Sequence, residues 1–490
     1  MKRRAALMGT ALGVGAIILG VGQLPSTRTD ERPNVIVLTS DDMSRSDLGA
    51  YGNTFIDTPN LDRLASESMK FDNFYAAPLC SPTRASFETG LHSVKVGITD
   101  HLPGYLWPYT PLYAPINREP YLPQEFDTIA EFFSEAGYKT AQFGKWHLEA
   151  YDELWETSNA LAHGYEEFEF SGLINRVLRR LTGKSRFHRW IEANGYGDAA
   201  NKSVHLTEYH AEIAADFIRE SKTEPFFLVV SINDPHAPYL AKEDLIEKYS
   251  ARQQSDAQET IDPVYAAMIE DVDAGIGIML QAVAESVIED DTIVVFFSDN
   301  GGVEIPFWDR DRPAQVTSNA PFRGQKGTLF EGGVRVPFMA RWPDHIPVSV
   351  TNEVAWVADL LPTFATFAGL DVEDHSFDGM DISDVLTNKG SAPDRALYFH
   401  LPHYHNSPPS SAILRDQHKL IVDFESGETL LFNLDEDPEE KMDLSDQLPE
   451  VSLALYSELE QWWEEAGAVI PQTNPEYDPA RAGEYVNVVR

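Results

Sequence analysis

Three strongly apolar segments of the chain each end in residues that carry oxygen or imidazole groups. The three segments are Asn34–Thr39, which leads into Ser40-Asp41-Asp42, Pro225–Ile232, which leads into Asn233-Asp234-Pro235-His236, and Thr292–Phe297, which leads into Ser298-Asp299-Asn300. Runs that are apolar on both faces are typical of strands covered on both sides, as in α/β proteins. Because such sheets place their sites at the carboxyl ends of the strands, we expect the terminal polar residues to meet there.

The four residues Asp41, Asp42, Asp299 and Asn300 form a set of oxygen donors. The Asp41-Asp42 pair, taken alone, could equally be part of a solvated turn or helix cap rather than a metal site. Carboxylates at the end of a buried strand are costly unless they meet a cation, which favours a metal site. Oxygen donors select Ca²⁺ or Mg²⁺ over softer metals, so calcium is expected, with magnesium as the alternative.

Cys80 is the only cysteine of the 490 residues, so the chain has no internal disulfide. An isolated cysteine often serves as a small buried apolar residue. Here Pro82 fits the first turn of a helix and Gly90 fits its end. Cys80 would then lie just ahead of a helix N-terminus, where free N–H groups favour negative charge, with Arg84 one turn further on and reaching back toward it.

Cys80, Pro82, Arg84, Thr89 and Gly90 together resemble the modification signature of the sulfatase family. That resemblance implies that Cys80 is oxidised to formylglycine, an aldehyde whose hydrate is the nucleophile, and that this group joins the aspartates at the metal. Glu88 departs from the family pattern, which usually has an apolar residue there.

Further segments resemble the same family. They are Gly144-Lys145-Trp146-His147-Leu148, the Pro235-His236-Ala237-Pro238 turn, and Asn319–Pro337 with Lys326 between glycines; Glu149 stands where the family usually has glycine. Without that context, Lys145 and His147 would be interpreted as a surface lysine and a packed histidine. The resemblance implies that Arg84 supports the formylglycine diol and Lys145 holds sulfate. His147 would take a proton in the elimination step, and Lys326 and His236 would face the leaving oxygen, with His236 as the acid.

The resemblance extends over about residues 32–480 and implies an alkaline-phosphatase-like α/β fold, with a large mixed sheet between helices. A helix over Val354–Gly369 would close this large domain. Short β-type runs after about Ser391 predict a small C-terminal α+β domain with an antiparallel sheet. We therefore expect an export segment at 1–28, a catalytic domain at 29–388 and a C-terminal subdomain at 389–490.

The N-terminus has the pattern of an export signal. Lys2-Arg3-Arg4 precedes an uncharged run from Ala5 to Leu24, as in a signal peptide. The arginine pair also fits twin-arginine export, and the run is long enough for an uncleaved membrane anchor. The expected location is periplasmic or secreted. The net charge of −40, from 38 basic and 78 acidic residues, argues against nucleic acid or an anionic membrane as a partner.

The implied reaction is hydrolysis of a sulfuric ester. The export signal, an aromatic-rich loop at 101–123 and a basic cluster at 176–189 favour a sulfated polysaccharide or oligosaccharide as substrate. Candidate substrate contacts are Arg176, Arg179, Arg180, His403 and His405, although the arginines also fit a solvated helix face and the histidines an ordinary loop. The expected partner in maturation is a formylglycine-generating or anaerobic sulfatase-maturating enzyme.

Three other functions stay open at the level of sequence. The protein could be an arylsulfatase of small esters, or a phosphodiester or phosphonate monoester hydrolase on the same fold. It could also be a sulfated-glycan-binding protein in which Cys80 is never modified.

Overall fold

The computed structural model describes residues 32–150, 155, 157–169, 190, 194, 205–255, 260–306 and 315–487. The predicted export segment and the three arginines Arg176, Arg179 and Arg180 lie outside these ranges. Within the described ranges, no helix is both long and apolar enough to cross a lipid bilayer.

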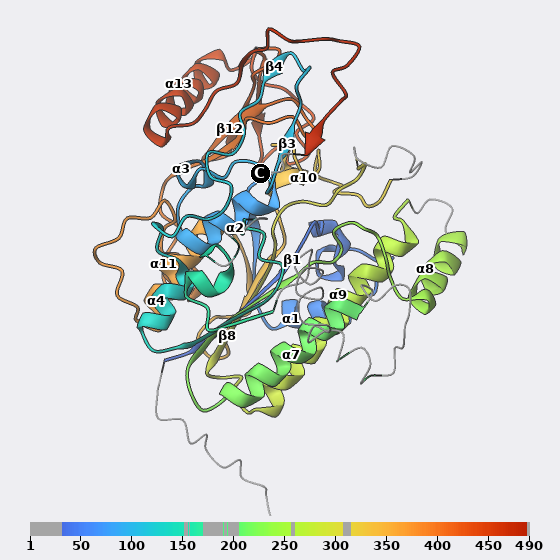
Figure 1. Ribbon diagram of the computed structural model, residues 1–490, viewed down its shortest axis with the longest axis vertical. Coiled ribbons are helices and arrows are strands. Elements are labelled where there is room, and N and C mark those ends of the chain that lie inside the picture. The colour runs from blue at the N-terminus through green and yellow to red at the C-terminus, as the bar shows by residue number, and fades with distance from the viewer. Residues whose placement is uncertain are drawn as a thin grey trace, which may run out of the picture.

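An eight-stranded mixed sheet forms the centre of the molecule (Figure 1). Its spatial order is β10 (Ser349–Trp356), β2 (Met69–Tyr75), β9 (Phe338–Arg341), β8 (Thr292–Ser298), β1 (Asn34–Ser40), β7 (Phe226–Ile232), β5 (Lys139–Gly144) and β6 (Glu167–Glu169). Strand β9 runs antiparallel to both of its neighbours, and the other pairs are parallel. The predicted large mixed sheet is therefore confirmed.

Helices cover both faces of this sheet (Figure 1). One face carries α1 (Pro59–Ser66), α7 (Leu206–Ser221), α8 (Glu243–Ser255) and α9 (Pro263–Glu285); the other carries α2 (Cys80–Thr89), α4 (Ile129–Glu135) and α11 (Leu360–Ala368). Along β1, Val35 and Val37 enter one hydrophobic core, whereas Ile36 and Leu38 enter the other. The alternation explains why the whole strand is apolar, since each face of the sheet is buried by helices.

Shorter helical turns connect these elements. They are η1 (Arg45–Asp47), η2 (Gly49–Tyr51), α3 (Ser93–Val96), η4 (Ala160–His163), α10 (Glu331–Val334), η6 (Val357–Asp359) and α12 (Ser383–Leu386).

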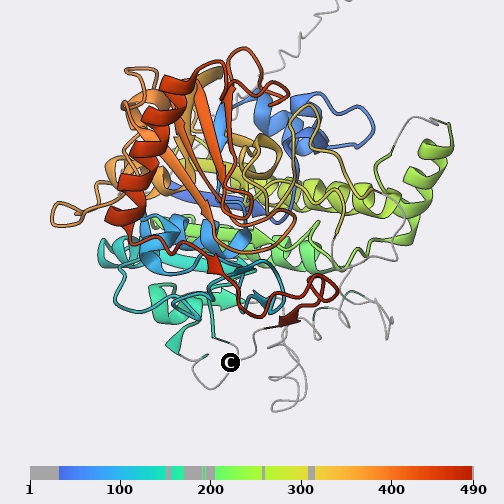
Figure 2. The same cartoon turned by 90° about the horizontal axis from the view of Figure 1, so that it is seen from above.

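The C-terminal region forms the predicted small antiparallel sheet with a helix on it (Figure 2). The strands are β11 (Ala396–Leu401), β12 (Ser410–Arg415), β13 (His418–Asp423) and β14 (Thr429–Asn433), and α13 (Pro449–Ala466) packs on β12 and β13. Leu397, Phe399 and Leu401 share a core with the large sheet. The two sheets are thus joined through one hydrophobic core, and the boundary at residue 388 stays a prediction.

The last part of the chain pairs with the aromatic-rich loop at 101–123. Strand β15 (Gln472–Thr473) pairs with β4 (Leu112–Tyr113), and β16 (Val486–Asn487) pairs with β3 (Tyr105–Leu106).

Two local predictions were wrong at their boundaries. Val354–Trp356 belong to strand β10, and the helix expected there begins only at Leu360. Pairing with β2 determines the conformation of Val354–Trp356, and periodicity alone does not reveal such pairing. Helix α2 begins at Cys80 rather than after it, and ends as predicted at Gly90 in the left-handed conformation, with φ of 66°.

Candidate active site

The adjacent strands β1 and β8 bring the two predicted acidic pairs together. They run parallel with Ser40 opposite Ser298, so Asp41 and Asp299 leave the sheet side by side. Asp42 has φ of 65°, a left-handed conformation that is uncommon outside glycine, and its amide donates to Asp299 Oδ1 at 3.3 Å. Such strain is found where surrounding structure holds a residue for a function.

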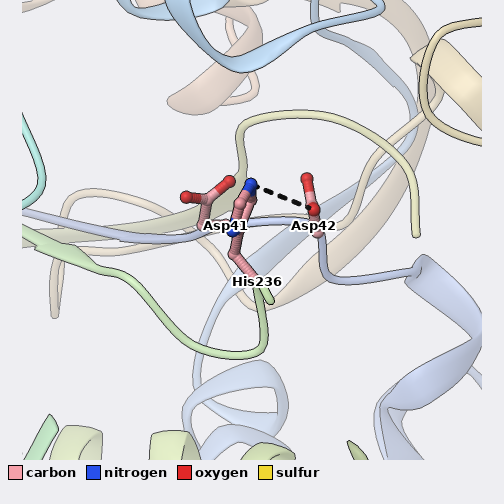
Figure 3. Close-up of side chains that lie close together, drawn as sticks. All are labelled: Asp41, Asp42 and His236. Carbon is pink, nitrogen blue, oxygen red and sulfur yellow. Dashed lines mark ion pairs between the residues drawn. The ribbon is translucent and has the colours of Figure 1, made fainter. Parts of the chain in front are cut away.

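The oxygens of this cluster are incompletely satisfied. Within the described part of the chain, Asp41 Oδ1, Asp42 Oδ2 and Asn300 Oδ1 are buried and have no hydrogen-bond partner. Candidate ligand atoms of Asp41, Asp42 and His236 lie within 4.8 Å of one another (Figure 3). The same holds for candidate ligand atoms of Asp41, Cys80 and Asp299. Buried carboxylate oxygens without partners are unfavourable unless a cation compensates them, so the predicted donor set fits a hard divalent metal.

Three basic side chains surround the same carboxylates. Lys145 pairs with Asp41, Lys326 Nζ lies 2.6 Å from Asp42 Oδ1, and Arg84 Nη2 lies 2.7 Å from Asp299 Oδ2. Burial opposes ionisation of Asp41, but Lys145 and the other nearby cations offset it, and its pKa lies well below the usual value. Arg84 also donates to the Lys145 carbonyl at 2.7 Å. The sequence had suggested that Arg84 reaches back toward Cys80, whereas its hydrogen bonds go to Asp299 and to this carbonyl.

Cys80 faces a histidine. Its Sγ lies 3.2 Å from His147 Nδ1, and His147 Nε2 lies 2.7 Å from the Leu102 carbonyl. Because a carbonyl only accepts, Nε2 carries the proton and Nδ1 is left as an acceptor toward residue 80. Burial, reinforced by Lys145, holds the pKa of His147 well below its usual value, and burial raises the pKa of the Cys80 thiol.

A pocket of about 500 Å³ opens over Cys80. Its lining combines the predicted residues His147, His236, Lys326 and His405 with Ala237 and Pro238 of the predicted turn. It adds His101 and Tyr105 from the 101–123 loop and Tyr239, none of which was singled out from the sequence. His101 Nδ1 lies 2.9 Å from Asp100 Oδ1, a pairing that orients its ring. The adjacent acid and histidine were a signal in the sequence, but nothing there placed the loop beside Cys80.

The two histidines predicted as substrate contacts occupy different positions. His405 lines the pocket, and burial together with His101 and Lys326 holds its pKa well below the usual value. His403 is 1% exposed, and among the described residues it is absent from the pocket lining. Its Nε2 lies 2.8 Å from Thr99 Oγ1, and its Nδ1 lies 4.0 Å from Asp100 Oδ2, so it supports the loop that carries His101.

The two residues that depart from the family pattern are buried beside the site. Tyr165 Oη donates to Glu88 Oε1 at 2.9 Å, and burial raises the pKa of Glu88 to about 8. Burial also raises the pKa of Glu149 to about 7. At neutral pH Glu88 is therefore mostly an uncharged acid, which fits a position otherwise filled by apolar residues.

Comparisons with known proteins agree with this site. The sulfatase family model matches residues 33–370, and the model of the N-sulphoglucosamine sulphohydrolase C-terminal region matches residues 324–465. N-acetylgalactosamine-6-sulfatase of Sus scrofa is 31% identical over 407 residues, which cover 78% of this chain and 71% of the relative. Arylsulfatase A of Homo sapiens is 30% identical over 389 residues, which cover 75% and 70%.

Among solved structures, the crystal structure of Ps i-CgsB in complex with k-i-k-neocarrahexaose matches with a TM-score of 0.71 and 25% identity, covering 91% of this chain and 94% of that one. The chain belongs to the sulfatase family, as its motifs indicated. It is a sulfuric ester hydrolase with the alkaline-phosphatase-like fold.

Proposed function

We propose that the protein releases sulfate from a sulfated polysaccharide or oligosaccharide by means of formylglycine at position 80 and a bound divalent cation. The observation that carries this proposal is the position of Cys80. It lies at the first turn of α2, on the floor of a pocket, with His147 at 3.2 Å and buried oxygens without partners beside it.

The cation is held by Asp41, Asp42, Asp299 and Asn300, together with residue 80, and we propose calcium, with magnesium as the alternative. A cation there neutralises charge on the sulfuryl oxygens, and the hydrated formylglycine supplies a hydroxyl nucleophile. An unmodified thiol is a poor candidate for that role, since its buried position raises its pKa.

The protein side chains complete the site. Lys145 and Lys326, each already close to an aspartate, bind the sulfate oxygens, and Arg84 fixes Asp299 and the diol. His147 accepts a proton from residue 80 through Nδ1. His236 Nδ1 donates to the Ala237 carbonyl at 2.6 Å, so His236 acts as the acid for the leaving oxygen through Nε2 in its imidazolium form, which the nearby Asp41 and Asp42 favour although burial lowers the pKa of His236.

Support for a sugar substrate comes from the pocket wall. Tyr105 and Tyr239 present aromatic rings, and His101 and His405 present polar edges, as expected of a site that binds a ring with hydroxyl groups. The names of two matched proteins, an N-acetylgalactosamine-6-sulfatase and a complex with neocarrahexaose, point to the same substrate class. Arg176, Arg179 and Arg180 stay proposed contacts for anionic groups, outside the described residues.

The proposal includes export and maturation. Lys2-Arg3-Arg4 and the uncharged run after it direct the chain to the periplasm or the medium. A formylglycine-generating or anaerobic maturating enzyme converts Cys80.

The test is a comparison of substrates on protein produced with a maturating enzyme. Sulfate release is measured by ion chromatography on a panel of sulfated glycans, an aryl sulfate and a phosphonate monoester, with Cys80→Ala as the control. We expect the highest kcat/KM on a glycan and none with the control variant. Activity confined to the aryl sulfate would overturn the proposed substrate. Faster phosphonate hydrolysis, or glycan binding without sulfate release, would overturn the proposed reaction.

A further inference from the structure

The loop between β11 and β12 contacts the walls of the active site at successive residues. His403 meets Thr99, Tyr404 Oη accepts from the Leu112 amide at 3.1 Å, and His405 lines the pocket. Two residues of the loop, Asn406 and Ser407, contact the segment that carries Lys326. This loop belongs to the C-terminal sheet, yet its side chains point into the large domain.

The backbone around Lys326 is held on both sides. Its own amide donates to the Gly302 carbonyl at 3.1 Å, and the Gly327 amide donates to the Pro78 carbonyl at 2.9 Å. On the other side, Asn406 Nδ2 donates to the Lys326 carbonyl at 2.8 Å, and Ser407 Oγ donates to the Gly327 carbonyl at 3.0 Å. The peptide units at 326 and 327 therefore lie between the end of β8, the start of α2 and the C-terminal loop.

Close packing reinforces these hydrogen bonds. Gly327 has φ of 73°, and a Cβ there would lie 2.0 Å from His405 Nδ1. The His405 amide in turn donates to the Ser407 carbonyl at 3.2 Å, which holds the loop in a turn. Only glycine fits at position 327 while His405 occupies its place in the pocket wall.

We propose that Asn406 and Ser407 are positioning residues for Lys326, and that the C-terminal sheet acts in catalysis through them. Lysine has a long, flexible side chain, so the position of its ammonium group depends on how firmly its backbone is anchored. Two side-chain hydrogen bonds to consecutive carbonyls anchor that backbone where Lys326 Nζ can meet a sulfate ester. The inference rests on the sulfate-binding role proposed above for Lys326.

The rival explanation is that Asn406 and Ser407 have a purely structural role. A double-mutant cycle distinguishes this explanation from a positioning role. The variants are Asn406→Ala, Ser407→Ala and the pair together, each made with Lys326 present and with Lys326→Ala. Asn474→Ala is a matched control, because Asn474 Nδ2 also joins the C-terminal region to two carbonyls of the large domain, those of Pro108 at 3.0 Å and Thr110 at 2.8 Å.

Three readouts are measured on every variant: kcat/KM on a nitrophenyl sulfate, the affinity for inorganic sulfate by calorimetry, which needs no turnover, and the melting temperature. With Lys326 present, the Asn406 and Ser407 pair should lower kcat/KM about 10- to 100-fold, the range for residues that orient a catalytic group, and should weaken sulfate binding. In the Lys326→Ala background, the same pair should change both readouts less than about twofold. Asn474→Ala should lower the melting temperature alone.

Equal losses in both backgrounds, or no loss with Lys326 present, would overturn the inference. A Lys326→Ala variant with wild-type turnover and sulfate affinity would instead overturn the role of Lys326 itself. The two failures are therefore distinguishable.

Discussion

Two of the buried lysines in the described part of the chain, Lys419 and Lys326, lie among carboxylates and differ in what surrounds them. Lys419, on β13, is fully buried and pairs with Glu331 at 2.8 Å and Glu440 at 3.0 Å, while Tyr75 Oη donates to Glu331 at 3.0 Å. Lys326 pairs with Asp42 Oδ1, but in the described structure Asp42 Oδ2 has no hydrogen-bond partner.

Lys326 also lines a pocket, together with Cys80, whereas Lys419 lies between the two sheets. Lys419 joins the C-terminal sheet to α10, and its charge is compensated by protein groups alone. The cluster around Lys326 is incomplete without a ligand. Among the described residues, three buried oxygens without hydrogen-bond partners, those of Asp41, Asp42 and Asn300, mark the candidate binding site, whereas the one such oxygen of the structural cluster, Glu440 Oε1, lies 3.0 Å from Lys419 Nζ.

The largest expected effect is on the structural cluster. Lys419→Met removes the cation beside Glu440 and one of the two beside Glu331, the other being Arg335 at 3.2 Å, and should lower the free energy of unfolding by about 3–5 kcal/mol, measured by urea denaturation. Lys441→Met is the control, because Lys441 is exposed on the surface beside Glu439. A Lys419→Met protein as stable as wild type would contradict the contrast between the clusters.

Lys326, the lysine proposed to bind sulfate, should behave in the opposite way. Lys326→Met should lower kcat/KM by about 10²–10³-fold, because it removes a positive charge that stabilises the negative charge developing on the sulfate in the transition state. Stability should change little when calcium is present, because the cation compensates Asp42. The rates of sulfate release and the urea midpoint are measured on the same preparations. A loss of stability equal to that of Lys419→Met would show that the two clusters serve one purpose.

The cation itself should stabilise the protein. Free calcium at 100 times its dissociation constant should raise the free energy of unfolding by about 2.7 kcal/mol, measured by urea denaturation with and without chelator. Asn300→Ala should reduce this response, because Asn300 contributes one of the oxygens without a partner. Lys419→Met should retain it. The absence of any response to calcium or magnesium would contradict the assignment of the metal site.

The smallest expected effect concerns Glu88. Its pKa of about 8 in the folded protein exceeds the value of 4.5 for a free side chain, so folding holds its proton. The stability it contributes is complete below about pH 4.5 and is lost as pH rises toward 8, with a slope of at most about 1.4 kcal/mol per pH unit. Glu88→Gln should flatten this part of the stability–pH curve. An unchanged curve would mean that Glu88 is ionised in the folded protein.

Much of the site could be predicted because its chemistry is located at the ends of strands. The four candidate metal ligands follow apolar runs that are typical of buried strands: Asp41, Asp42, Asp299 and Asn300. Parallel pairing of β1 and β8 then places the ends of these two strands side by side. The motif around Cys80 likewise predicted helix α2 within a residue or two, since Pro82 and Gly90 restrict the backbone.

The parts that could not be predicted depend on loops. His101 and Tyr105 reach the pocket because β16 pairs with β3 and His403 supports Thr99, contacts between residues about 300 or more positions apart. The partner of Arg84 was missed for a similar reason, since Asp299 follows strand β8, 215 positions away in sequence. No local pattern encodes such contacts, which form only when distant segments of the chain pack together.

The central claim is that Cys80 becomes the nucleophile of a sulfatase. The most direct measurement is mass spectrometry of the tryptic peptide Phe71–Arg84 from protein produced with a formylglycine-generating enzyme, alongside sulfate release by the same sample. We expect the mass of an aldehyde at residue 80, in proportion to the sulfate-releasing activity of each preparation. Full activity from protein whose Cys80 is an unmodified thiol would contradict it.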